Sequence, residues 1–238
     1  MSVEIINKKS IAKSFGNAAA TYDSVAHFQR WVGNELLALI PTNHSLNKPL
    51  NIVDLGCGTG YFLKRLQIKY PEANVMGFDL SEDMIRFARQ THSKQDKSNK
   101  TTWVVGDGES LPFKTGSIDL IFSSLAIQWC GSLEKLFNEI QRVLSDEGIF
   151  VFSSLVDGSL SELKVSWAQV DNDQHVNVFA YVSDYQEALA KSALKTELLE
   201  TQTKVLHYQK VKDLTQELKA LGAHNMTAQR STHLTGKQ

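Results

Sequence analysis

The sequence predicts an α/β fold in which a mostly parallel, twisted sheet carries helices on both faces. The first observation is that strand-like apolar segments alternate with helix-like amphipathic segments between residues 50 and 156. The second is a glycine-rich turn that joins the first of these strands directly to the first of these helices. Parallel strands need crossover connections, which helices usually supply, so this alternation is typical of a parallel sheet covered on both sides.

Length and composition indicate one domain spanning residues 1–238. With 238 residues, of which 42% are hydrophobic, the chain can bury a full core. We expect an N-terminal helical cap (1–48), a central core (49–156) and a later part (157–238). In the cap, apolar residues recur on one helical face and stop at Pro41. They are Phe28, Trp31, Val32, Leu36, Leu37, Leu39 and Ile40.

The core and the later part contain the remaining predicted elements. Apolar runs predict strands at 50–55, 74–79, 101–105, 117–123 and 147–155. Apolar periodicity predicts helices at 59–69, 81–91 and 132–144, with a Ser- and Lys-rich loop at 92–100. In the later part we expect two helices within 157–197, a candidate strand at 203–209 and a helix at 211–221 ending near Gly222. The polar residues 232–238 show no strand pattern.

Charge, hydropathy and cysteine usage exclude several classes of protein. The net charge is −1, which gives no bulk attraction to nucleic acid or membranes. No apolar run approaches the ~20 residues that span a bilayer, and residues 1–5 lack the layout of a signal peptide. Cys57 and Cys130 are too few for a disulfide framework, and the histidines, His224 and His233 included, show no metal-ligand spacing. We therefore expect a cytoplasmic protein without a metal site.

The most informative segment runs from Asp54 to Gly60, at the end of the first predicted strand. Its glycines, Gly56, Gly58 and Gly60, permit positive φ and let a ligand approach the main chain closely. A dinucleotide fingerprint has its third glycine one place later than this segment does. The segment instead resembles the first motif of class I S-adenosylmethionine (SAM) methyltransferases. That resemblance implies a Rossmann-like fold, SAM as cofactor, and a loop that holds a methionine moiety rather than a pyrophosphate.

Two further acidic residues follow predicted strands. Asp79 ends the second strand, where a carboxylate can accept both hydroxyls of a ribose. Asp107 follows the third strand, where SAM-dependent enzymes usually hold the adenine amino group. Any one of these acids alone is equally well explained as a helix cap or turn residue, but together with Asp54 they outline one cofactor. The resemblance implies cofactor binding by Asp54, Gly56, Cys57, Gly58, Gly60, Asp79, Leu80, Asp107, Gly108 and Ser124, with Cys57 also serving as a small buried filler.

The chain also resembles a narrower family, the malonyl-acyl-carrier-protein O-methyltransferases of biotin synthesis. The resemblance covers essentially the whole chain, and its first two segments are the most specific. The segments are 14–23, 124–130, 158–163, 218–225 and 234–237. Family members continue for a few dozen residues past the last segment, so the resemblance implies that this chain stops before the family's final strand. They also tend to carry an arginine before the phenylalanine of the insert, whereas Val178 precedes Phe179 here.

This resemblance implies methylation of the free carboxylate of a malonyl group carried by acyl carrier protein or by coenzyme A. No strong general base is required, because a carboxyl group with a pKa of about 3 to 4 is already ionised at neutral pH. The resemblance implies that Tyr22 orients the carboxylate, although it would also suit an aromatic lid, and that Lys13 pairs with it. Gln128, Trp129 and Phe179 are the predicted substrate-binding residues. The N-terminal helices and the insert at 157–197 are expected to cap the site.

An acidic carrier protein would need a basic docking face. The candidate lysines are Lys204, Lys210, Lys212 and Lys219. The sequence leaves three other functions open. The chain could be another class I small-molecule methyltransferase, acting on a quinone carbon or a different carboxylate. It could be a nicotinamide-linked dehydrogenase, which the early third glycine and Asp107 disfavour, or a protein that binds SAM without catalysis.

Overall fold

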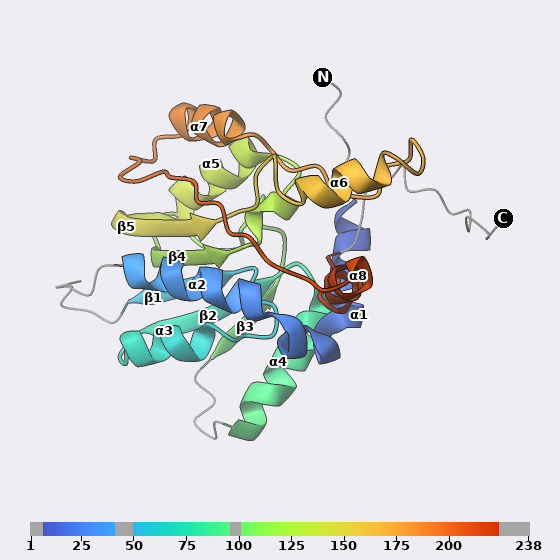
Figure 1. The fold of residues 1–238 in the computed structure, drawn as a ribbon. Helices are drawn as coiled ribbons and strands as arrows, with labels where there is room; N and C mark the ends of the chain where they lie inside the picture. Colours follow the sequence, from blue (N-terminus) through green and yellow to red (C-terminus); the bar gives the residue numbers. More distant parts are fainter. Residues whose placement is uncertain (1–6, 41–49, 96–100, 224–238) are drawn as a thin grey trace.

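The computed structural model describes residues 7–40, 50–95 and 101–223, and a five-stranded sheet forms its centre (Figure 1). The strands lie in the order β3-β2-β1-β4-β5, and all neighbouring pairs are parallel. Their bounds are β1 Asn51–Leu55, β2 Asn74–Asp79, β3 Thr102–Val105, β4 Ile118–Ser124 and β5 Leu144–Ser153. The predicted parallel sheet is confirmed, and each predicted core strand overlaps an observed one.

Helices cover both faces of this sheet, as the sequence predicts. Side chains alternate along a strand, so the neighbours Ile52 and Val53 enter separate apolar clusters on opposite faces. The Ile52 cluster includes α2 (His27–Leu39) and α3 (Leu63–Lys69), which Figure 1 shows in front of the strands. The Val53 cluster includes α5 (Leu133–Val143) and α7 (Val182–Lys191). The two clusters bury the sheet and leave its edge at the strand ends for the site.

Two helix boundaries differ from the predictions for a physical reason. Helix α3 starts at Leu63 rather than at residue 59, because glycines with positive φ form the turn before it. Helix α4 (Glu82–Gln95) continues past residue 91, so the predicted loop is wrong over 92–95, while residues 96–100 lie outside the described stretches. The ring of His92 packs edge-on against Trp103, with centroids 5.2 Å apart, which holds this extra turn on the sheet.

The N-terminal cap consists of α1 (Lys8–Val25) and α2, which meet at Ala26. Helix α1 contacts α4 and also α8 (Val211–Ala220). The Ser14 and Thr21 hydroxyls donate hydrogen bonds to the carbonyls of Gly222 and Ala220, at 3.0 and 2.9 Å. Gly222 has a φ of +72° directly after α8, so the predicted end of this helix is confirmed. The other residues predicted for the cap, 1–6 and 41–48, lie outside the described stretches.

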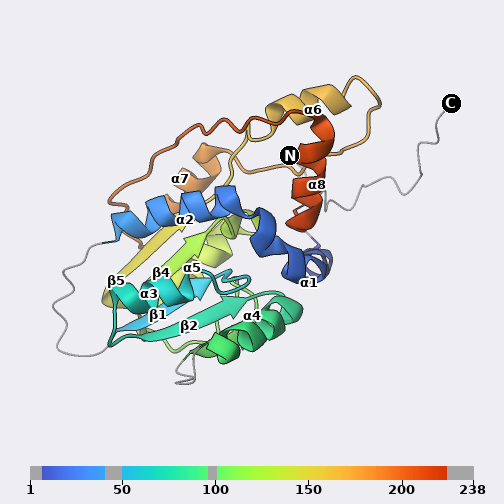
Figure 2. The ribbon, with the colours of Figure 1, turned by 60° about the horizontal axis from the view of Figure 1, so that its bottom comes forward.

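The later part contains the two helices expected within 157–197, α6 (Ser161–Trp167) and α7. The candidate strand at 203–209 is wrong, because this segment forms no strand and joins no sheet. Figure 2 shows the chain between α7 and α8 passing over α2 as an irregular segment. Val205 and Leu206 are 62% and 42% exposed, so an apolar pattern here does not correspond to a buried face. The predictions for residues 232–238 and for the chain end concern residues outside the described stretches.

Candidate functional site

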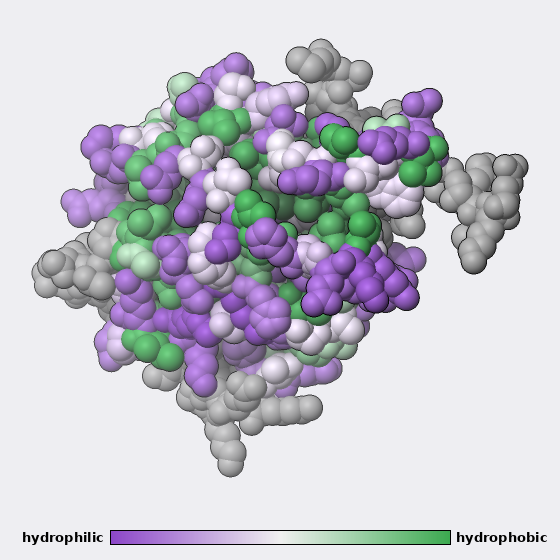
Figure 3. Space-filling model, viewed as in Figure 1, coloured by the Kyte–Doolittle hydropathy of each residue, from purple (hydrophilic) through white to green (hydrophobic). Residues whose placement is uncertain are grey.

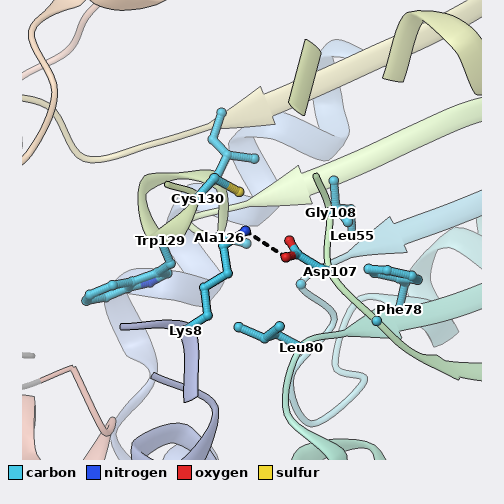
Figure 4. A pocket seen from close by; sticks show the side chains of 12 residues that line it. Lys8, Leu55, Phe78, Leu80, Asp107, Gly108, Ala126, Trp129 and Cys130 are labelled. Atoms are coloured by element: carbon cyan, nitrogen blue, oxygen red, sulfur yellow. Dashed lines mark hydrogen bonds and ion pairs between the residues drawn. The ribbon is translucent and has the colours of Figure 1, made fainter. Parts of the chain in front are cut away.

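A cleft of about 430 Å³, part of it open to solvent, lies where β1 to β4 end. Strand order reverses between β1 and β4, and open α/β sheets bind ligands at such a switch point. Five residues predicted for the site line the cleft, namely Gly56, Leu80, Asp107, Gly108 and Trp129. Figure 4 shows that Lys8, which the sequence interpretation did not single out, also reaches into it toward Asp107.

The three loop glycines all have positive φ, but the space that a side chain would find differs among them. At Gly56, with a φ of +78°, a side-chain Cβ would lie 2.2 Å from the Cβ of Ala126. At Gly60, with a φ of +82°, a Cβ would lie 2.7 Å from the rings of His92 and Trp103. At Gly58, with a φ of +52°, a Cβ would meet no described atom within 4 Å. Gly56 and Gly60 therefore serve packing, whereas Gly58 exposes bare backbone to open space.

Asp54 is a buried acid with an incomplete set of partners. Its side chain sits at the end of β1 and the residue is only 2% exposed. Its Oδ2 atom is buried and has no hydrogen-bond partner among the described residues. Burial and, to a lesser extent, the charge of Asp79 raise the pKa of Asp54 to about 8. A positively charged hydrogen-bond donor at Oδ2 would give this atom a partner and would lower the pKa of the carboxyl group.

Asp79 is held rigidly at the end of β2. Its two carboxylate oxygens each accept a backbone N–H at 2.8 Å, one from Gly58 and one from Ser81. Burial raises its pKa, while these hydrogen bonds oppose that shift. Leu80 contributes a third backbone hydrogen bond to this carboxylate, which has about four acceptor positions, so Asp79 can still accept from a ligand beside Leu80.

Asp107 pairs with a lysine from the cap. The Lys8 Nζ lies 2.7 Å from an Asp107 oxygen and 2.6 Å from Glu109. Although partial burial alone would lower the pKa of Lys8, the bonds to both carboxylates raise it. Glu109 also accepts the N–H groups of Gly131 and Ser132, at 2.5 and 3.2 Å. Lys8 and Glu109 were missed because their partners are distant in sequence and no local motif marks them.

The two predicted catalytic residues lie in different surroundings. Tyr22 lies on α1 and is not among the residues that line the cleft. Burial raises the pKa of its phenol, and the charge of Asp79, which lies near enough to act on it, adds to this rise. The phenol is therefore a proton-bearing hydrogen-bond donor at neutral pH. Lys13 is exposed on α1 and is not among the residues that line the cleft. Lys8 is the α1 lysine that reaches the cleft.

The predicted substrate residues group around the short 3₁₀ turn η1 (Ile127–Trp129), which follows β4. Trp129 lines the cleft and meets Phe15 of α1 edge-on, with ring centroids 5.4 Å apart. The Gln128 amide donates to the Leu125 carbonyl at 2.8 Å and so is held beside the turn. Phe179 lies between α6 and α7 and is buried. It is not among the residues that line the cleft, whereas Trp129 is. Ser124 ends β4, with its hydroxyl 3.4 Å from that of Ser153.

The described residues show no arrangement for metal or thiol chemistry and no helix suited to a bilayer. No group of three or more His, Cys, Asp or Glu side chains there is placed to hold a metal ion. Cys57 and Cys130 are unpaired, and burial raises the thiol pKa of both, that of Cys130 to about 12. None of the helices described has the length and apolar character to cross a membrane.

Sequence comparisons connect the chain to methyltransferases. Residues 53–152 match the family described as "Methyltransferase domain". The chain is 42% identical over 233 residues to the biotin biosynthesis bifunctional protein BioHC of Cellvibrio japonicus, covering 98% of this chain and 44% of that protein. It is 40% identical over 230 residues to the malonyl-acyl-carrier-protein O-methyltransferase of Methylococcus capsulatus, covering 97% of this chain and 82% of that enzyme. The chain thus spans less than half of the bifunctional relative and most of the monofunctional one.

Solved structures agree with these relatives on the fold. A putative methyltransferase from Haloferax volcanii, solved with the Trm112 activator, has a TM-score of 0.59 at 23% identity and covers 74% of both chains. Geranyl diphosphate C-methyltransferase from Streptomyces coelicolor has a TM-score of 0.54 at 17% identity, covering 70% of this chain and 58% of that chain. At this level of identity the likeness establishes the fold, which is the predicted class I methyltransferase fold.

Proposed function

This chain belongs to the malonyl-acyl-carrier-protein O-methyltransferase family, and we propose that it methylates the free carboxylate of malonyl-acyl carrier protein with SAM as methyl donor. The product is the malonyl methyl ester, which enters biotin (pimeloyl) synthesis. The observation that carries this proposal is the 40% identity to a malonyl-acyl-carrier-protein O-methyltransferase over 97% of the chain. The cleft at the strand ends supports it with residues suited to the cofactor.

The residues around the glycine loop fit SAM. Gly58 offers bare backbone, and the unpartnered oxygen of Asp54 complements an ammonium group. Asp79 would accept the ribose hydroxyls and Asp107 the adenine amino group, while Leu80 and its apolar neighbours would enclose the nucleoside. When bound, SAM supplies a methyl group activated by a positively charged sulfonium.

For the acceptor, the protein has mainly to orient a carboxylate and exclude water. The nucleophile is already charged, so alignment rather than proton removal sets the rate. Tyr22 is the proposed donor to that carboxylate, because its raised pKa keeps the phenol protonated. Trp129 is a proposed wall for the malonyl group, and Gln128 and Phe179 are proposed contacts farther along the acyl chain. Lys13 is exposed on α1. Its ammonium is therefore proposed to pair with the carboxylate of an acyl group that arrives from solvent, and not with a buried group.

A docking face for the acidic carrier protein is proposed on and beside α8. Lys212 and Lys219 lie on this helix, Lys210 precedes it, and all three are exposed. Figure 3 shows strongly hydrophilic residues gathered where Figure 1 places α8. Lys204 lies with its Nζ 4.4 Å from the centre of the Trp31 ring, which joins this face to the cap over the cleft. Attraction between basic and acidic faces speeds encounter and weakens as salt is added.

The test is intact-mass spectrometry of malonyl-acyl carrier protein after incubation with this chain and SAM. A gain of one methyl group is expected, and acetyl-acyl carrier protein, which has no free carboxylate, should gain none. Calorimetry of SAM binding runs in parallel. Binding without any methyl transfer would contradict the proposed reaction and leave a protein that binds SAM without this activity.

A further inference from the structure

Resting on the proposed use of SAM, we propose that Gln29 and Arg30, at the start of α2, hold the amino-acid end of that cofactor together with Asp54. Neither residue of α2 was singled out by its sequence. The inference gives the cap helix a direct part in cofactor selection, beyond covering the cleft.

Three buried polar atoms are left without hydrogen-bond partners among the described residues. They are the Oε1 of Gln29, the Nε of Arg30 and the Oδ2 of Asp54. An unpaired buried polar group is costly, and native proteins keep few of them. Two of these atoms accept hydrogen bonds and one donates. The ammonium of SAM donates and its carboxylate accepts, so the amino-acid end of SAM offers a partner of the right kind for each of the three atoms.

The guanidinium of Arg30 is fixed beside the glycine loop. Its Nη2 donates to the backbone carbonyl of Asp23 at 2.6 Å and lies 3.4 Å from the carboxylate of the same residue. That carboxylate accepts the hydroxyl of Thr59, within the loop, at 2.9 Å. The Cζ of Arg30 lies 4.6 Å from the centre of the Tyr61 ring, immediately after the loop. One end of the guanidinium is therefore anchored, and Nε is the donor left over.

The same contacts favour the carboxylate of the cofactor over that of the acceptor. Arg30 is tied to residues 59–61, the segment next to Gly58, where the methionine part of SAM is expected. Two of the proposed acceptor contacts, Gln128 and Trp129, instead follow β4, whereas Tyr22 lies near enough to Arg30 for the charge of Arg30 to act on its pKa. A planar guanidinium matches a carboxylate better than a lysine ammonium does. Arg30 is thus a positioning and binding residue for the amino-acid end, not for the malonyl group.

The experiment compares three ligands by calorimetry: SAM, decarboxylated SAM and methylthioadenosine, which lacks the whole amino-acid end. Arg30→Gln should weaken SAM about 10- to 100-fold, the range of one charged hydrogen bond, and leave the other two within about twofold. Gln29→Ala should weaken SAM and decarboxylated SAM, which both carry the amine, and spare methylthioadenosine. Arg30→Lys keeps the charge and should recover only part of the loss.

Arg65→Gln is the matched control. The Arg65 guanidinium also stacks on Tyr61, with Cζ 3.6 Å from the ring centre, and donates to the Tyr61 carbonyl, so its loss perturbs the same ring. All three affinities should stay unchanged in this variant.

Equal weakening of all three ligands by Arg30→Gln would make the residue a fold support and overturn the inference. Unchanged SAM affinity with a raised KM for malonyl-acyl carrier protein would overturn it in favour of the acceptor. Failure of the wild type to bind SAM at all would instead refute the proposed function.

Discussion

Replacing Asp54 with asparagine should stabilise the ligand-free protein, although it removes a proposed binding residue. Burial, together with the charge of Asp79, raises the pKa of Asp54 to about 8, whereas an unfolded aspartate has a pKa of about 3.9. A carboxyl whose pKa rises on folding stabilises the native state below its unfolded pKa. That stabilisation is lost as the pH rises through the folded pKa, because the unfolded chain ionises first. Asparagine has no such penalty.

The size of the effect follows from the two pKa values. Between about pH 4 and pH 8 the unfolding free energy of the wild type should fall by ~1.4 kcal/mol per pH unit relative to that of Asp54→Asn. The difference in unfolding free energy should therefore grow to on the order of 5 kcal/mol near pH 8 and stay level above it. Saturating SAM should narrow the difference, because only the wild type keeps the carboxylate for the ammonium.

Urea denaturation of both proteins at several pH values between about 5 and 8 measures this difference. Asp119→Asn is the matched control. Asp119 is also buried, at 3% exposure, but its oxygens accept the Asn51 N–H and the Ser145 hydroxyl, at 2.9 and 3.0 Å. Removing that charge should destabilise the protein. A difference between wild type and Asp54→Asn that does not change with pH, or a less stable variant at pH 8, would refute the reasoning about Asp54.

Three further outcomes are expected. Tyr22→Phe should lower kcat at least tenfold, because it removes one charge-assisted hydrogen bond, and should change SAM affinity little. Unchanged turnover would remove Tyr22 from the site. Gly58→Val should abolish SAM binding in calorimetry. The control is Gly116→Val, in the turn before β4, where Gly116 has a φ of +67° and equally open surroundings. This control variant should lose stability but keep SAM binding. Glu139→Gln should cost about 1 kcal/mol in urea denaturation, because Glu139 accepts bonds from Arg142 and the Leu111 N–H. The Arg142 bond lowers the pKa of Glu139, so this cost should fade as the pH drops through that pKa.

The sequence could place three acidic residues at one edge of the sheet because the strand ends fix their positions. In a parallel sheet, residues that follow neighbouring strands must meet at one edge, so Asp54, Asp79 and Asp107 could be placed together from their spacing alone. The glycine loop is equally local, and its positive φ values follow from residue type. Among the three loop glycines only Gly58 has open space where a Cβ would lie, and that distinction depends on neighbours such as Ala126 and Trp103, which the motif does not specify.

The cap side could not be predicted in this way. Lys8 meets Asp107 across 99 residues of sequence, and Arg30 meets the glycine loop through a bend between α1 and α2. A helical periodicity indicates which face of a helix is apolar, but it does not indicate which polar residue contacts a loop that is distant in sequence. Lys13 and Lys8 illustrate this point. They lie on the same helix, but Lys13 is exposed whereas Lys8 lines the cleft.

The charges of the two sides make the cap part of the binding site. The strand ends contribute the acids Asp54, Asp79 and Asp107, and the charge of Asp79 helps to raise the pKa of the buried Asp54. The cap brings Lys8 to Asp107 and Arg30 to the ring of Tyr61, beside the glycine loop. The Oδ2 atom of Asp54 still lacks a hydrogen-bond partner among the described residues. A ligand carrying an ammonium and a carboxylate would complete both the core and the cap at once. Its binding should therefore tighten α1 and α2 on the sheet, and slower amide exchange in these helices with SAM than with methylthioadenosine would be the direct sign.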